Sequence, residues 1–194
     1  MISAIINIVT LSQIVLFTAF LFFKRSHRVS NKLLIGFLVS QGFVYINNLV
    51  FFFYDYVYMN LPHLIFAGQA FMFLWAPLLY LYVCSLTTTG FSFNRKLLPH
   101  FLPFAVAFFF LLFTFYIHDA ETKRQIMDTR DIGFYFQIWA ALVHIQILVY
   151  IVLAILRLNR FAVQLKNNFA SLDKINLRWL RTLLYSYIDR KSVV

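Results

Sequence analysis

Charged residues are scarce in this chain. Only 12% of its 194 residues are Asp, Glu, Lys or Arg, whereas 62% are hydrophobic and 25 are phenylalanine. A water-soluble domain of this length needs far more charged surface, because its exposed side chains must be hydrated. The mean hydropathy of +0.77 points the same way. The composition therefore excludes an ordinary soluble domain and predicts a membrane protein.

Cysteine, glycine and clustered acids are scarce as well. Cys84 is the only cysteine, so no intrachain disulfide can form, and the five glycines form no phosphate-binding loop. No Asp lies within the apolar blocks described below, and no GxS-type nucleophile with a histidine partner is present, which argues against an intramembrane protease. The acidic residues Asp119, Asp128 and Asp131 share one loop that we place outside, away from cytoplasmic nucleotides. We therefore predict no catalytic residues and no cofactor.

The histidines give no sign of a metal centre. They are dispersed over loops and helices without HxxxH or HExxH spacing, and the chain has no paired cysteines. Zinc and di-iron sites require such spacing, because several ligands must converge on one ion. We therefore predict no metal site.

Five apolar blocks have the length of a membrane span. About 20 residues of α-helix cross a bilayer core, and each block is free of Asp, Glu, Lys and Arg. The blocks are Ile2–Phe23, Leu33–Tyr54, Leu64–Leu86, Phe101–Ile117 and Phe134–Leu156. A further apolar stretch, Leu177–Ile188, has only half this length and is followed by Asp189, Arg190 and Lys191. We predict an all-α integral membrane bundle of five complete transmembrane helices plus a truncated sixth.

Basic residues in the loops predict that the N-terminus lies outside. Lys24 and Arg25 follow the first block, whereas a signal peptide carries its positive charge before the apolar run. The loops then placed in the cytoplasm carry Lys24, Arg25, Arg28, Lys32, Arg95, Lys96, Arg157, Arg160, Lys166, Lys174, Arg178 and Arg181. The outer loops carry Lys123, Arg124 and Arg130. The net charge of +10 therefore reflects topology and contact with anionic lipid, and does not indicate nucleic-acid binding.

Neutral polar residues form stripes on three of the predicted helices. The second block carries Ser40, Gln41, Asn47 and Asn48 at a seven-residue spacing that brings them to one face together with Gly36. The third carries Gln69, Met72, Ala76 and Tyr80, and the fifth carries Gln137, Ala140, Ala141 and His144. Two interpretations stay open: the stripes pack helices against one another, or they line a cavity for a small or lipophilic ligand. The candidate ligand-binding residues are Gln41, Asn47, Asn48, Gln69, Gln137 and His144.

Two further features bear on conformational change. Pro77 lies in the middle of the third block, where it removes one helix hydrogen bond and forms either a static bend or a hinge. After the fifth block, Phe161, Leu165 and Phe169 recur at helical spacing among basic and amide residues. This pattern predicts a cytoplasmic amphipathic linker, as one helix or two, that lies on the membrane surface or docks a partner.

Three segments resemble a known family. "APLLYLYVCSL", "LLPHFLPF" and "SLDKINLRWLRTLL" are similar to the multi-helix N-terminal membrane domain of membrane-anchored bacterial AraC-type transcriptional regulators. The similarity covers roughly residues 10–188. Its most specific residues are Pro77, Leu78, Tyr80, Tyr82, Val83, His100, Phe101, Pro103, Phe104, Lys174, Ile175, Asn176, Leu177, Trp179, Leu180 and Arg181. The chain departs from the family at Ala76, where glycine is expected, and in its short sixth helix and missing DNA-binding region.

The resemblance implies a sensory role. In such proteins the Trp-Leu-Arg segment opens a sixth helix, and a cytoplasmic helix-turn-helix domain follows and binds DNA. We therefore expect a membrane-embedded input domain in a bacterial inner membrane, with the ending "DRKSVV" left by a reading frame interrupted inside the sixth helix. This fragment should not bind DNA directly, and a homodimer is implied. The candidate signal-transmission residues are Pro77, Phe161, Leu165, Phe169, Trp179 and Arg181.

The predicted organisation has three parts. Residues 1–157 form the transmembrane bundle, 158–176 the amphipathic linker, and 177–194 the truncated sixth helix and tail. Two alternative functions stay open. A small polytopic carrier or enzyme would depend on His144 and Gln137, and a membrane regulatory subunit would act on a separate partner through the linker.

Overall fold

The computed structural model describes residues 2–24, 29–129, 132–168 and 182, and this part of the chain is helical throughout, with turns and short loops between helices. The α-helices are α1 (Ile2–Phe23), α2 (Val29–Phe52), α3 (Tyr54–Asn60), α4 (Met72–Thr87), α5 (Leu102–Leu111), α6 (Ala120–Thr129) and α7 (Ile132–Asn168). Short 3-10 segments are η1 (Pro62–Leu64), η2 (Gln69–Phe71) and η3 (Arg95–Phe101), and η4 (Leu112–Tyr116) is a single wide π turn. The predicted all-α class is confirmed.

Five helical stretches are long and apolar enough to cross a membrane. They are Ile2–Phe23, Val29–Phe52, Pro62–Thr87, Arg95–Tyr116 and Gly133–Gln164. The shortest has 22 residues, which at about 1.5 Å per residue exceeds the roughly 30 Å of a bilayer core. Large hydrophobic side chains cover much of the outside, and a lipid bilayer solvates such a surface far better than water does. The prediction of five helices long and apolar enough to span a membrane is confirmed.

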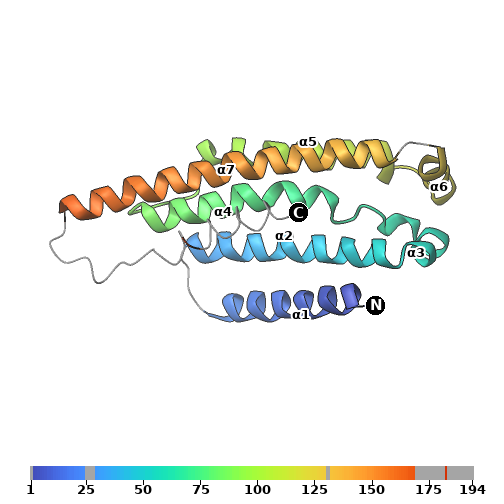
Figure 1. Ribbon diagram of the computed structural model, residues 1–194, viewed down its shortest axis with the longest axis horizontal. Helices are drawn as coiled ribbons and strands as arrows, with labels where there is room; N and C mark the ends of the chain where they lie inside the picture. The colour runs from blue at the N-terminus through green and yellow to red at the C-terminus, as the bar shows by residue number, and fades with distance from the viewer. Residues whose placement is uncertain (1, 25–28, 130–131, 169–181, 183–194) are drawn as a thin grey trace.

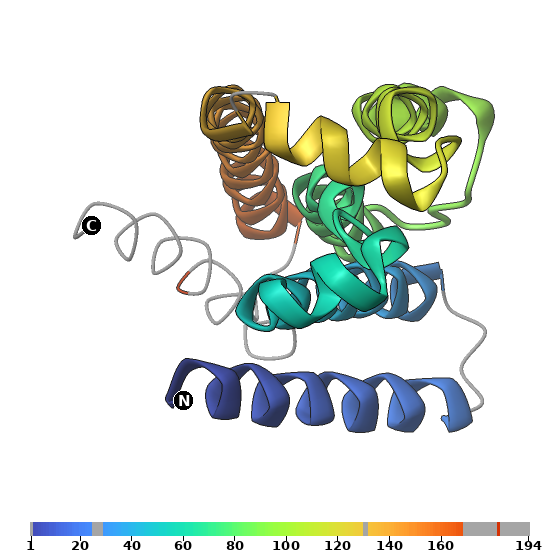
Figure 2. The same ribbon diagram turned by 90° about the vertical axis from the view of Figure 1, so that its right-hand side faces the viewer.

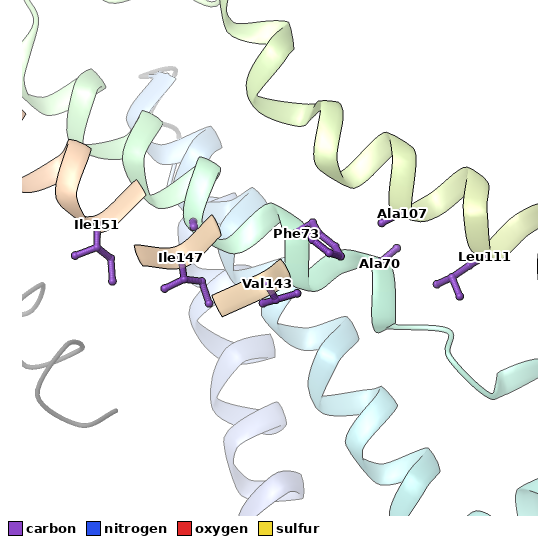
Figure 3. Packing of buried hydrophobic residues seen from close by; sticks show 8 residues of the cluster. Ala70, Phe73, Ala107, Leu111, Val143, Ile147 and Ile151 are labelled. Carbon is purple, nitrogen blue, oxygen red and sulfur yellow. The ribbon is translucent and has the colours of Figure 1, made fainter. Parts of the chain in front are cut away.

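In the view of Figure 1 the long helices run in similar directions, whereas Figure 2 shows α1 crossing the end view at an angle to α5 and α7. Viewed from one end, α4 occupies the middle of the bundle, α2 lies beside it, and α1 packs on the outer side of α2 (Figure 2). The main core joins α4, α5 and α7, and Figure 3 shows Phe73, Ala107 and Val143 of these helices converging there. Burial of these apolar side chains holds together the part of the bundle that contains Pro77.

The third and fourth spans are interrupted helices, although the composition predicted simple apolar blocks. The third begins with η1, passes through Phe66, whose φ is 66°, and becomes α-helical only at Met72. The fourth begins with η3, in which Pro99 lies, and Pro103 follows at the start of α5, where a missing N–H costs nothing. Hydropathy reports the apolar length of a span, but not where its backbone leaves the α-helical path.

The last span lies within one long helix, α7. The 37 residues of α7 correspond to about 55 Å, well beyond the thickness of a bilayer core. It continues through residue 157, where we expected the bundle to give way to a separate linker, because no proline or glycine interrupts it there. Over residues 158–168 the linker is therefore a continuation of α7. The rest of the predicted linker and, except for residue 182, the predicted sixth helix fall outside the described residues.

The short helices α3 and α6 gather at one end of the bundle (Figures 1 and 2). The Tyr58 hydroxyl of α3 donates to the Asp128 carboxylate of α6 at 2.8 Å and 2.9 Å. The Arg124 guanidinium donates to the backbone carbonyls of Tyr58 and Met59 at 3.1 Å and 2.6 Å. These contacts dock α6 on α3, and we call this pair of helices the α3–α6 cap.

Candidate functional site

Two candidate ligand-binding residues pair with each other. The Asn47 side-chain amide of α2 donates to the side-chain oxygen Oε1 of Gln69 at 3.2 Å, and the Gly68 N–H donates to Asn47 Oδ1 at 3.4 Å. Asn47 is 1% exposed and Gln69 is 6% exposed. A paired amide inside an apolar bundle links the helices that carry it. This pairing is the kind of contact that the packing interpretation predicts for Asn47.

The backbone comes unusually close at this contact. A Cβ atom added to Gly68 would overlap the Phe43 carbonyl oxygen of α2 and would lie 2.7 Å from Asn47 Cβ. Real Cβ atoms are almost never that close to another heavy atom, so this position requires glycine. The irregular start of the third span places Gly68 against α2 and lets its N–H reach Asn47.

The other polar candidates are placed differently. Gln41 is half-buried on α2, whereas Asn48 is exposed. On α7, Gln137 and His144 both lie on the exposed side of the helix. His144 Nδ1 is 2.6 Å from the carbonyl oxygen of Ala140 on its own helix. The structure therefore does not bring these four residues together in the way that Asn47 and Gln69 are paired.

A groove of about 680 Å³ runs between α5 and α7. Its lining includes Phe73, Val106, Phe110, Trp139, Leu142 and Gln146. Val106 and Leu142 are 62% and 52% exposed, so the groove opens on the lipid-facing side of the bundle. Cavities of this size that have apolar and aromatic walls and few polar groups are typical sites for small ligands.

The groove also contains the hydrogen bond that compensates for Pro77. Proline at position 77 has no N–H, so the carbonyl of Phe73 loses the donor that a regular helix would supply. The side-chain amide of Gln146 on α7 donates to this carbonyl at 3.1 Å. Both Phe73 and Gln146 line the groove. A neighbouring helix thus satisfies the carbonyl freed by the proline, as expected for a kinked helix within a bundle.

A smaller cavity of about 90 Å³ adjoins the groove. The two share Phe110, Tyr135 and Trp139 in their linings. Gln69 also lines the small cavity, and so do Ile126 and Met127 of α6. Helix α6, which belongs to the α3–α6 cap, therefore forms one wall of the small cavity.

A buried lysine also holds α6 against η1 and η4. Lys123 of α6 is 1% exposed, and its Nζ is 2.6 Å from His63 Nδ1 and 3.2 Å from the carbonyl oxygen of Tyr116. The Nζ also lies 5.4 Å from the centre of the Phe115 ring and 5.7 Å from that of Tyr116, within the range of cation–π attraction. Burial lowers the pKa of Lys123, and the charge of Asp119 opposes this shift.

The signal-transmission candidates divide between described and undescribed parts of the chain. Pro77 is buried in α4, and Phe161 is half-buried on the extension of α7. Leu165 is in the same helical extension, whereas Phe169, Trp179 and Arg181 fall outside the described residues. At the α4–α7 junction, the Arg157 guanidinium donates to the hydroxyls of Thr87 and Thr88 at 3.2 Å and 2.7 Å.

Sequence reasoning did not select several of the residues that shape this site. A proline within a span implies a free carbonyl, but the sequence does not say that Gln146 satisfies it. Lys123 and His63 are 60 positions apart, and only the docking of α6 brings them together. Within residues 2–24, 29–129, 132–168 and 182, no group of three or more His, Cys, Asp or Glu side chains is placed to hold a metal ion.

Replacing Gln146 with leucine is expected to lower the free energy of unfolding by about 1 kcal/mol. The Phe73 carbonyl would lose its donor in an apolar environment. The measurement is SDS-induced unfolding in mixed micelles. Gln137→Leu is the matched control, because Gln137 lies exposed on the same helix, and it should be neutral. Equal effects of the two changes would show that the amide of Gln146 does not support the kink.

No known protein family, curated protein or solved structure matches this chain. The fold and the site thus stand on the described residues alone, as an apolar bundle with five helices that could span a membrane.

Proposed function

We propose that this chain is the membrane-embedded input module of a transcriptional regulator and that it binds a lipophilic ligand in the groove between α5 and α7. One observation carries the proposal. The hydrogen bond that compensates for Pro77 joins Gln146 to the Phe73 carbonyl, and both of these residues line the groove. A molecule in this groove would therefore touch the contact that supports the kink of α4.

The nature of the groove favours a ligand taken from the bilayer. Its walls are aliphatic and aromatic, and its open side is formed by exposed residues such as Val106 and Leu142. A lipophilic molecule is concentrated in the membrane and could enter sideways without crossing water. The amide of Gln146 supplies a polar group that would orient it.

Ligand binding has a direct route to the far end of the bundle. A ligand that accepts a hydrogen bond from Gln146 competes with the Phe73 carbonyl and shifts the preferred bend of α4. The end of α4 is tied to α7 through Arg157, Thr87 and Thr88. Because α7 continues without interruption to Asn168, a change in α4 would be passed to the segment beyond the bundle.

The resemblance to membrane-anchored AraC-type regulators supplies the second half of the proposal. In such proteins a helix-turn-helix domain follows the membrane domain on the cytoplasmic side. Loop charge supports the same orientation, with the N-terminus outside an inner membrane. The extension of α7 with Phe161 and Leu165 would then be the first element to transmit the signal.

Filling the groove tests the proposal. In a Trp75→Phe/Trp179→Phe background, the fluorescence of Trp139 in detergent micelles should be quenched saturably by 9,10-dibromostearic acid. Val106→Phe should raise the concentration needed for half-saturation at least about tenfold, which corresponds to about 1.4 kcal/mol. Quenching that rises linearly, as for a probe dissolved in the micelle, would contradict a site.

Val149→Phe is the matched control. Val149 is 50% exposed on α7, and the groove lining does not include it. The substitution adds the same ring to the lipid-facing surface and should leave half-saturation unchanged. An equal loss of affinity in both variants would place the probe on the general surface and not in the groove.

A further inference from the structure

We propose that Lys123 and His63 form a pH-sensitive latch, in which the pair shares one proton when α6 is docked and releases α6 when a second proton binds. The inference rests on the proposed function in one respect, since the small cavity lined by α6 adjoins the groove proposed to bind the ligand. The latch itself is defined by contacts of α6 with η1 and η4 and by no ligand.

The contact between Lys123 and His63 allows the pair only one positive charge, whereas the two side chains could each be protonated if they were apart. At 2.6 Å, one nitrogen of the Lys123–His63 pair must donate and the other must accept. An ammonium can donate to a neutral imidazole, and an imidazolium can donate to a neutral amine. Two cations cannot share this contact, because neither nitrogen would then have a lone pair and the charges would repel each other.

Burial makes the second proton costly. Lys123 is 1% exposed and is enclosed by the Phe115 and Tyr116 rings, and no salt bridge to Lys123 occurs within the described residues. In an apolar setting two adjacent cations are stabilised far less than in water. His63 is exposed, so water can deliver a proton to the outer member of the pair. The second proton is therefore accommodated by separating the pair.

The other charged groups on and beside α6 are bound to other partners or are exposed. On α6, the Arg124 guanidinium binds backbone carbonyls, Asp128 accepts from Tyr58, and Glu121 is exposed. Asp119 precedes α6, and hydrogen bonds from Thr122 hold its pKa below the usual range.

The remaining titratable neighbours are Tyr116 on η4 and Tyr58 and Asp55 on α3. The hydrogen bond to Asp128 raises the pKa of the Tyr58 hydroxyl, and Asp55 is exposed on α3. Carboxyl groups normally titrate near pH 4 and tyrosines near pH 10. The second imidazole near α6 belongs to His118, which lies beside Asp119.

The sign of the effect follows from proton counting. The open cap binds one more proton than the docked cap, so docking is favoured as pH rises and is weakened as pH falls. Linkage of one proton changes the ratio of open to docked α6 by at most tenfold per pH unit, and we expect a rise of about tenfold between pH 7.5 and pH 5.5.

Thiol accessibility measures this ratio. Cys84→Ser removes the single cysteine. Met127→Cys then places a thiol on the buried side of α6, where Met127 is 9% exposed, and Glu121→Cys places one on its exposed side. Maleimide labelling in detergent micelles is followed at both pH values, and the rate at position 127 is divided by that at 121 to remove the intrinsic pH dependence of thiols. The normalised rate should rise about tenfold at pH 5.5.

Three substitutions decide between the latch and a general acid effect. His63→Gln keeps an acceptor for Lys123 but cannot bind the proton, so the rise should vanish. Lys123→Met should abolish it as well, whereas His118→Gln should preserve it. A flat wild-type response, or a rise that persists in His63→Gln, would overturn the latch.

The result does not depend on the ligand experiment. Ile126→Cys provides a second reporter under α6 if Met127→Cys fails to fold, because Ile126 also lines the small cavity. A pH-dependent cap together with linear quenching by the fatty acid would retain the latch and reject the ligand site. The reverse pattern would retain the site and reject the latch.

Discussion

Gly68→Ala is expected to lower the free energy of unfolding by about 3 kcal/mol. The added methyl group would overlap the carbonyl oxygen of Phe43, which belongs to the backbone of α2 and cannot rotate away. The third span would have to move off α2, and the hydrogen bond from the Gly68 N–H to Asn47 would break. SDS-induced unfolding in mixed micelles, followed by tryptophan fluorescence, measures the change.

Gly36→Ala is the control for this prediction. A Cβ at position 36 would lie 3.6 Å from the nearest atom, a side-chain carbon of Leu78, which is an ordinary van der Waals contact. Alanine also has a higher helix propensity than glycine, so this variant should be neutral or slightly more stable. Equal free energies of unfolding for Gly68→Ala and Gly36→Ala would contradict the close approach of the third span to α2 at Gly68.

Asn47→Leu is expected to lower the free energy of unfolding by about 2 to 3 kcal/mol. The substitution removes the acceptor of the Gly68 N–H and the donor to Gln69 Oε1 in a position that neither water nor lipid head groups reach. Both partners would be left unpaired among apolar groups. The same unfolding measurement applies, and binding of 9,10-dibromostearic acid would show whether Gln69, which lines the small cavity, stays in place.

Asn48→Leu provides a control from the next residue of the same helix. Asn48 is exposed, so leucine there should be neutral or stabilising in an apolar solvent. A double variant, Asn47→Leu/Gln69→Leu, should lose less than the sum of the two single changes, because each single change already breaks their shared hydrogen bond. Strict additivity would mean that the two amides do not interact.

These predictions and the two proposals concern one continuous region of the bundle. The Asn47–Gln69 pair holds the irregular start of the third span, and Gln69 borders the small cavity beneath α6. That cavity adjoins the groove whose lining includes Gln146 and Phe73. Substitutions at the Asn47–Gln69 pair, in the groove and at the Lys123–His63 contact therefore test packing, ligand binding and the latch separately, although the three sites are neighbours.

The sequence determined the class of this protein and the number of its apolar spans. Hydropathy and helix length are properties of one segment at a time, so five long charge-free blocks were sufficient to predict five helices that could span a membrane. Proline chemistry likewise depends on the local backbone, and Pro77 had to leave the Phe73 carbonyl without its usual donor.

Only the tertiary structure decided which polar residues meet. Helical periodicity placed Asn47 and Asn48 in one stripe, yet one is buried against the third span and the other is exposed. Periodicity defines a face of a helix but does not identify the helix that packs on it. For the same reason the pairing of Gln146 with α4 and of Lys123 with His63 came from the docking of distant segments, which determines the partner of each buried polar group.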